Sequence, residues 1–342
     1  MNWQDLVTTA KSLAANSKGL LAMDESIGTC NKRFGPLGIA QTEESRRQYR
    51  ELILTTPGLG ESISGVILHD ETIRQKKSDG TPFLDIIGKS EIIPGIKVDA
   101  GATELAFYPG ETITEGLDGL RDRLAEYAQM GLKFAKWRGV IGLDDEIPSQ
   151  SCINVNANAL ARYAALCQEA GLVPIVEPEV LMDGACSIER CAEVTERVLR
   201  TVFAQLYDQS VNLNAMILKP NMVLEGLKAA KQSTVNEVAD ATVECLLRSV
   251  PAAVPVVAFL SGGQSAEMAS ARLNAMTVRF KEALPWALTF SFARAIQQPA
   301  LELWRGQPEN VGAAQKALVH RARCNLLARQ GKYDVSVDGS NP

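Results

Sequence analysis

Eight short apolar segments recur along the chain, and each ends in polar or charged residues. They cover residues 19–25, 64–71, 92–99, 133–140, 173–180, 215–222, 254–263 and 287–295. Near-continuous runs of valine, isoleucine and leucine at strand length are typical of parallel strands that are buried on both faces. The pattern therefore predicts eight buried strands.

Helical periodicity fills most of the intervals between these strands. It predicts an amphipathic helix within residues 1–17 and further helices near 42–56, 117–131, 157–170, 194–206, 234–250, 265–276 and 308–331. Thr234 and Glu237 have the spacing of a capping box, which satisfies free N–H groups at the start of a helix. The helical signal is weak between residues 71 and 92, where only FLDII after Pro82 fits it.

This alternation of strands and helices predicts an α/β fold. Strands that recur about every 30–45 residues, with helices between them, are typical of a single (β/α)8 TIM barrel. We expect one domain over residues 1–342, with an N-terminal helix and a short flexible C-terminal tail from about residue 333. A doubly wound open sheet is the alternative. Its first strand is usually followed by a GxGxxG turn, where this chain has DESIGT.

Composition narrows the classes of function. The 342 residues carry a net charge of -5, which argues against a general nucleic-acid binder with its basic stripe. The seven cysteines are irregularly spaced, so they do not predict a disulfide framework. Two histidines are too few for a histidine-rich metal centre, so the only metal site that stays possible is one made of carboxylates. The sequence has no apolar run of about 20 residues and no signal-peptide core, so we expect a cytoplasmic protein that does not bind membranes.

Polar residues gather where the predicted strands end, and the active site of a barrel forms at those C-terminal ends. In chain order they are Asp24, His69, Asp70, Glu71, Lys97, Asp99, Lys136, Arg138, Glu177, Glu179, Lys219, Ser261, Gly262, Gly263, Ser291 and Arg294. Residues two apart point to the same face of a strand, so Lys136 is expected beside Arg138, and Glu177 beside Glu179.

Lys219 is the most informative of these residues. It interrupts an apolar strand and Pro220 follows it, so its amine is expected to be buried. Burial and a nearby cation such as Lys136 both disfavour the ammonium form, which favours a nucleophilic amine. The alternative is a structural ion pair between Lys219 and Glu177. The excess of lysines at the strand ends favours the catalytic interpretation.

Two segments have the composition of anion sites. Residues 260–265 (LSGGQS) follow the seventh predicted strand and open a helix, and Arg294 ends the eighth; small residues and a helix N-terminus let backbone N–H groups approach a phosphate. A Gly-Gly pair by itself is more often a plain turn. Residues 31–33 (NKR) are a second candidate, with a solvated basic pair as the alternative. A substrate with phosphates at both ends would explain both segments.

We interpret the two histidines of the chain as structural residues. His69 is expected to pack or to form a hydrogen bond at a strand end, and His320 lies in the last predicted helix. Neither is expected to take part in chemistry.

Taken together, these segments resemble the class I fructose-bisphosphate aldolases. The motifs are LLAMDES from Leu20, GVILHDET from Gly65, GIKVD from Gly95, FAKWR from Phe134, PIVEPE from Pro174, LKPNM from Leu218, FLSGGQS from Phe259 and WALTFSFARA from Trp286. The resemblance implies reversible cleavage of fructose 1,6-bisphosphate to dihydroxyacetone phosphate and glyceraldehyde 3-phosphate, in glycolysis, gluconeogenesis or the Calvin cycle. It implies no cofactor and no metal, and a cytoplasmic homo-oligomer, which in this family is commonly a tetramer.

The resemblance also implies a role for each matching residue. Lys219 looks like the lysine that forms a Schiff base with the ketose carbonyl, Glu177 like the general acid/base, and Asp24 like the carboxylate that orients the lysine and the reacting hydroxyls. Lys136 would place a positive charge against both lysine and substrate. The residues expected to bind substrate are Lys97 and Arg138 as polar support, Ser261, Gly262, Gly263, Ser291 and Arg294 at one phosphate, and Ser26, Thr29 and Arg33 at the other.

The chain departs from the family pattern at three places. Phe292-Ala293 stands where Tyr-Gly is common, which tightens the approach to the backbone, and Thr29 replaces a common serine but keeps the hydroxyl. The animal enzymes end in a tyrosine that aids proton exchange on the enamine, whereas no tyrosine follows Tyr333 here, so we expect another group to protonate the enamine. Rival interpretations are another Schiff-base barrel enzyme such as a transaldolase, a metal-dependent aldolase, and a catalytically silent binding scaffold.

Overall fold

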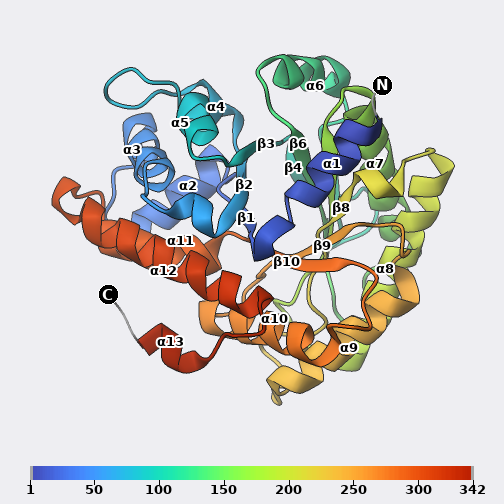
Figure 1. The fold of residues 1–342 in the computed structure, drawn as a ribbon. Helices are drawn as coiled ribbons and strands as arrows, with labels where there is room; N and C mark the ends of the chain where they lie inside the picture. The colour runs from blue at the N-terminus through green and yellow to red at the C-terminus, as the bar shows by residue number, and fades with distance from the viewer. Residues whose placement is uncertain (1–2, 340–342) are drawn as a thin grey trace.

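The strands predicted from the apolar segments form a closed barrel in the computed structural model, which describes residues 3–339 (Figure 1). Their bounds are β1 Gly19–Ala22, β2 Ile63–Leu68, β3 Ile93–Lys97, β6 Phe134–Ile141, β7 Val173–Val180, β8 Ile217–Leu218, β9 Val256–Phe259 and β10 Ala287–Phe292. All neighbours pair in parallel, in the order β1-β10-β9-β8-β7-β6-β3-β2. The predicted (β/α)8 barrel is confirmed, and closure of the sheet excludes the doubly wound alternative.

The barrel interior has a small apolar core of its own, to which most strands contribute. The first helix, α1 (Trp3–Ser12), adds Leu6 and Ala10 to this core and packs beside the turn that leads into β8. It therefore closes the end of the barrel at which the strands begin. A Cβ on Gly95 of β3 would overlap the ring of Phe134, so this glycine makes room for the ring inside the barrel.

Helices cover the outside of the barrel. Besides α1 they are α2 Ile27–Phe34, α3 Glu43–Leu54, α4 Asp70–Arg74, α5 Phe83–Lys89, α6 Leu120–Gln129, α7 Gln150–Glu169, α8 Ile188–Asp208, α9 Val235–Ser249, α10 Ala266–Phe280, α11 Arg294–Trp304, α12 Val311–Arg329 and α13 Val335–Gly339, with short 3-10 turns at Ala15–Ser17, Gly35–Leu37, Leu59–Glu61, Leu213–Ala215 and Pro308–Asn310. The capping box at α9 is confirmed, because Thr234 and Glu237 each accept a hydrogen bond from the other's backbone N–H. The sequence does not predict α2 or α11.

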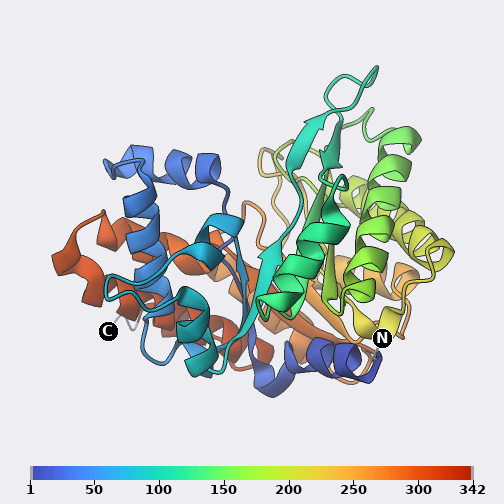
Figure 2. The same cartoon turned by 90° about the horizontal axis from the view of Figure 1, so that it is seen from above.

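A short antiparallel hairpin, also absent from the sequence prediction, stands outside the barrel. Its strands are β4 (Gly101–Glu104) and β5 (Thr112–Glu115), and Figure 2 shows them extending beyond the neighbouring helices. Asn156 of α7 holds the hairpin: its Oδ1 accepts from the Thr114 N–H at 3.2 Å, and its Nδ2 donates to the Thr112 carbonyl at 2.8 Å. The two strands carry few buried apolar residues, so no apolar segment marks them.

The end of the chain differs from the flexible tail expected from about residue 333. Tyr333 is buried, and residues 335–339 form α13, which packs beside α12 and α10 (Figure 1). Asp338 holds this segment in place by accepting hydrogen bonds from Arg321 and Tyr333. The rest of the expected tail, residues 340–342, lies outside the described residues.

None of the helices of residues 3–339 is both long enough and apolar enough to cross a membrane.

Candidate active site

Three charged side chains meet where β6, β7 and β8 end. Lys136 lies in β6 and Glu177 in β7, and Lys219 directly follows β8, where its N–H donates to the Val176 carbonyl at 2.8 Å. Glu177 lies between the lysines, with Oε1 3.0 Å from the Lys219 Nζ and Oε2 3.1 Å from the Lys136 Nζ. The structure therefore contains both the Lys136 cation expected near Lys219 and the Lys219–Glu177 ion pair that was given as the alternative.

Asp24 joins this group from the segment after β1. Its Oδ2 lies 2.7 Å from the Lys136 Nζ. The four side chains form a continuous series of ion pairs, Asp24–Lys136–Glu177–Lys219, in which no residue is more than 8% exposed. Two positive and two negative charges balance, which is the condition under which ionised groups are stable away from water.

The neighbouring charges determine the protonation state of this series. Burial would raise the pKa of Asp24, but the positive charges of Lys136 and Lys219 outweigh burial and hold that pKa well below its usual range. The same balance lowers the pKa of Glu177. Burial would lower the pKa of Lys136, but Asp24 and Glu177 raise it. Near neutral pH both carboxylates are therefore ionised, and Glu177 is in the form that accepts a proton.

Two further cations at the strand ends are each held by an acid. The Lys97 Nζ lies 2.5 Å from the Asp99 Oδ1 and donates to the Asp99 carbonyl at 2.8 Å. Arg138 pairs with Glu179 of the neighbouring strand, and its backbone N–H donates to the Asp99 Oδ2 at 3.2 Å. The sequence marks Asp99 and Glu179 only as strand-end acids, and the structure shows that they position these cations.

The turn after β9 favours glycine at Gly262. This residue has a φ of +55°, in the left-handed region that residues with a side chain rarely adopt. A Cβ on Gly262 would also meet the end of the Met182 side chain, and a Cβ on Gly263 the end of the Leu227 side chain, and both of these side chains can move. The backbone conformation of Gly262 is therefore the stronger requirement.

The other residues predicted for this anion site lie at the same turn. The Arg294 Nη2 donates to the Gly262 carbonyl at 2.6 Å, which brings the start of α11 to the end of β9. Ser261 and Ser291 are buried, and the Ser291 hydroxyl has no hydrogen-bond partner among the described residues. A buried hydroxyl without a partner is uncommon in folded proteins, and a bound anion would supply the missing acceptor.

The residues predicted for the second phosphate lie at opposite ends of α2: Ser26 and Thr29 are at its start, whereas the basic segment 31–33 is in its last turn. Ser26 caps this helix, and its Oγ lies 3.3 Å from the Thr29 N–H donor and 3.1 Å from the Thr29 hydroxyl. The Arg33 Nη1 lies 2.5 Å from the Glu25 Oε1. The two hydroxyls therefore lie together at a helix N-terminus, while a buried carboxylate balances the charge of Arg33.

Sequence reasoning missed Glu25, which links three helices. Its carboxylate accepts hydrogen bonds from Arg50 of α3 at 2.7 Å and from Gln297 of α11 at 3.0 Å, in addition to Arg33 of α2. Its position next to Asp24 is the one signal in the sequence. Its partners are far away along the chain, so the pattern could not reveal them.

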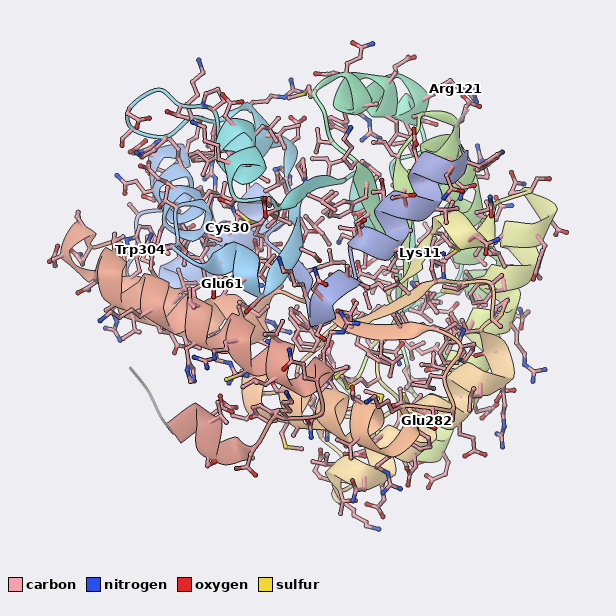
Figure 3. The ribbon with its side chains drawn as sticks, viewed as in Figure 1. Lys11, Cys30, Glu61, Arg121, Glu282 and Trp304 are labelled. Atoms are coloured by element: carbon pink, nitrogen blue, oxygen red, sulfur yellow. The ribbon has the colours of Figure 1, made fainter. Side chains whose placement is uncertain are left out.

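Aromatic packing holds the same three helices together. Trp304 of α11 stacks on Tyr49 of α3, with ring centroids 5.5 Å apart, and meets the edge of Phe34 of α2 at 6.2 Å. Figure 3 labels Trp304 of α11 and Cys30 of α2, both in the left half of that view. Helix α2, which carries Arg33, and helix α11, which begins at Arg294, are therefore packed together through aromatic contacts.

A closed parallel barrel with a buried lysine at the end of one strand, in contact with a proton-accepting carboxylate, defines a lysine-dependent barrel enzyme. The family model of class I fructose-bisphosphate aldolases matches residues 5–341. The chain belongs to the class I fructose-bisphosphate aldolase family, as its sequence motifs indicated.

Individual relatives agree with this assignment. The probable fructose-bisphosphate aldolase class 1 of Xanthomonas campestris pv. campestris is 54% identical over 334 residues, which cover 97% of this chain and 99% of that protein. The cytosolic fructose-bisphosphate aldolase 6 of Arabidopsis thaliana is 50% identical over 96% of this chain and 91% of that protein. The fructose-bisphosphate aldolase of Plasmodium falciparum, solved in complex with TRAP and a small-molecule inhibitor, has a TM-score of 0.95 at 46% identity, over 97% of this chain and 96% of that one.

Proposed function

We propose that this chain cleaves fructose 1,6-bisphosphate reversibly to dihydroxyacetone phosphate and glyceraldehyde 3-phosphate through a Schiff base on Lys219, without a metal. The observation that carries the proposal is the contact between Lys219 and the ionised Glu177 at the C-terminal end of the barrel. It places a nucleophile and a base within hydrogen-bonding reach, as covalent catalysis by an amine requires.

The first steps form the covalent intermediate. Glu177 first takes a proton from Lys219, and the freed amine attacks C2 of the ketose. A second proton passes from the nitrogen to the C2 oxygen and gives the carbinolamine. Glu177 then returns its proton to the carbinolamine hydroxyl, which leaves as water, and a protonated imine remains. Lys136 supports these transfers because it stays positively charged beside Glu177 and Asp24.

Cleavage uses the imine as an electron sink. The electron pair of the C3–C4 bond moves toward the positively charged nitrogen, the C4 hydroxyl loses its proton to a carboxylate, and the aldehyde departs. Asp24 orients the reacting hydroxyls and the lysine. A proton then returns to C3 of the enamine, and water releases the ketone product. Proton transfer by a positioned group contributes about 10²–10⁴-fold to rate, so the imine supplies much of the remaining acceleration.

Both ends of the substrate are anionic, and two groups of residues suit them. The backbone of residues 261–263 with Ser291 and Arg294 binds one phosphate, supported by the unpartnered Ser291 hydroxyl. Ser26 and Thr29 at the start of α2, with Arg33 from its last turn, bind the other, supported by the two hydroxyls at a helix N-terminus. Lys97 and Arg138 serve as polar support.

The remaining expectations belong to the same proposal. The chain acts as one domain, works in the cytoplasm and assembles as a homo-oligomer, a tetramer by family resemblance. The names of relatives support the location, since the Arabidopsis thaliana relative is called cytosolic and one of Spinacia oleracea, 48% identical, is called a cytoplasmic isozyme.

The test is a coupled assay of fructose 1,6-bisphosphate cleavage, with and without EDTA, alongside fructose 1-phosphate. We expect full activity in EDTA and a preference for the bisphosphate. Loss of activity in EDTA would point to a metal-dependent enzyme, and a preference for the monophosphate to another Schiff-base enzyme. No cleavage at all would point to a silent scaffold.

A further inference from the structure

Three metal-ligating side chains lie together outside the catalytic site, between α12 and α13. His320 and Cys324 are four residues apart on α12 and so share one face of that helix, and Asp338 comes from α13. The Cys324 Sγ lies 3.6 Å from the His320 Nε2 and 3.4 Å from the Asp338 Oδ1, and the two latter atoms are 3.8 Å apart. The donor atoms therefore form a nearly equilateral triangle.

The triangle has the size of one face of a zinc coordination tetrahedron. Zn²⁺ binds sulfur at about 2.3 Å and nitrogen or oxygen at about 2.0–2.2 Å, so the corners of a tetrahedron with one sulfur are about 3.3–3.7 Å apart. The two separations from the Cys324 Sγ, 3.4 and 3.6 Å, fall in this range, and the His320–Asp338 separation of 3.8 Å has to shorten slightly when the ion binds. Hydrogen bonds of the Cys324 thiol account for two sides of the triangle, but the third side is too long for a hydrogen bond.

The kinds of donor select the metal. A thiolate, an imidazole and a carboxylate suit Zn²⁺, whereas Mg²⁺ and Ca²⁺ prefer oxygen ligands alone. Metal binding displaces the thiol proton of Cys324, because the thiolate is the form that ligates Zn²⁺.

The surroundings position the carboxylate and leave a route for the ion. Arg321 and Tyr333 donate to Asp338 and so orient it, as outer partners orient metal ligands. Arg321 donates to the same Asp338 Oδ1 that would ligate the ion, so its charge opposes a cation and the Cys324 thiolate has to supply the compensating negative charge. A cavity of about 710 Å³ borders His320 and Cys324 and has room for a water molecule as the fourth ligand.

We propose that His320, Cys324 and Asp338 form a Zn²⁺ site that fastens α13 to α12, with water as the fourth ligand. The site lies apart from Lys219 and takes no part in cleavage, so it is compatible with a metal-independent aldolase. The sequence predicts no such site, because two ligands sit within a helix pattern and the third lies in the segment expected to be flexible.

The experiment uses the full chain stripped of metal and titrated with Zn²⁺ by calorimetry and with Co²⁺ by absorption spectroscopy. We expect one Zn²⁺ per chain, and for Co²⁺ a thiolate charge-transfer band together with the strong visible bands of tetrahedral coordination. Cys324→Ser and Asp338→Asn should each weaken Zn²⁺ binding by at least about tenfold. Cys245→Ser, which changes a buried cysteine of α9, is the matched control and should bind as the unaltered chain does.

Asp338→Asn keeps the test decisive even where Cys324→Ser does not fold, because Asp338 lies in the last helix. Fructose 1,6-bisphosphate cleavage in the same samples should be equal with and without Zn²⁺. The proposal is overturned by the absence of Zn²⁺ binding, by binding that Asp338→Asn leaves unchanged, or by a Co²⁺ spectrum without the charge-transfer band. Each of these results leaves the aldolase activity untouched, so the two proposals fail separately.

Discussion

Replacing Lys136 by methionine tests whether the buried charges depend on one another. Lys136→Met nearly keeps the length of the side chain but removes the ammonium that lies 2.7 Å from Asp24 and 3.1 Å from Glu177. Removing one partner from a buried ion pair costs about 3–5 kcal/mol of unfolding free energy, because the remaining charge is left without compensation. That cost corresponds to a roughly 10²- to 10⁴-fold change in the folding equilibrium.

The cost must depend on pH. In the unaltered chain the pKa values of Asp24 and Glu177 are lowered, so the stability they contribute is fully present above the ordinary carboxyl pKa of about 4 and is lost as the pH falls toward the lowered values. Without Lys136 the pKa of each carboxyl rises, because burial is then opposed only by the remaining cations such as Lys219. The carboxyls therefore take up protons at a higher pH than in the unaltered chain, and the penalty shrinks. The difference in unfolding free energy between the two chains is therefore largest near neutral pH and decreases in acid.

Urea unfolding followed by tryptophan fluorescence, at several pH values, measures this difference. The matched control is the double variant Asp24→Asn/Lys136→Met, which removes one charge of each sign. It should be more stable than Lys136→Met alone by about 1–3 kcal/mol, because the two sites are coupled. A double variant whose cost is the sum of the two single costs, or a cost of Lys136→Met that does not change with pH, would refute the reasoning.

Three other results are expected. Glu177→Gln should lower kcat for fructose 1,6-bisphosphate by about 10²–10⁴-fold in steady-state kinetics; a change in KM alone would contradict its role in proton transfer. Gly262→Ala forces a side chain onto a φ of +55°, a strain of about 1–2 kcal/mol, and should raise KM about tenfold; an unchanged KM would remove this turn from the phosphate site. Asn156→Ala leaves the Thr114 N–H unpaired and should lower the unfolding free energy by about 1–3 kcal/mol, and an unchanged urea midpoint would show that Asn156 does not hold the hairpin.

The barrel is predictable from the sequence because burial on both faces produces continuous apolar runs. Each of the predicted segments matches one barrel strand, with β2 and β6 each extending one residue beyond its segment, down to β8, which is only two residues long. Lys219 is recognisable for the same reason, since a charged residue inside an apolar run stands out. Helices with a clear polar side and a side-chain cap, such as α9, are predicted equally well.

The missed features depend on contacts between distant residues. The β4–β5 hairpin is held by Asn156 rather than by its own apolar residues. Glu25 matters because of Arg50 and Gln297, which lie 25 and 272 residues away in sequence. Helix α13 consists of five residues with little propensity of their own and is fixed by the contacts of Asp338. No local pattern encodes these partners.

The role of Lys219 as the nucleophile is tested most directly by borohydride reduction in the presence of fructose 1,6-bisphosphate, followed by mass spectrometry of the peptides. Reduction converts the imine to a stable secondary amine, so we predict a mass increase on the peptide that contains Lys219 and none in the Lys219→Met variant. An active chain that yields no adduct, or an adduct on a lysine other than Lys219, would contradict the mechanism.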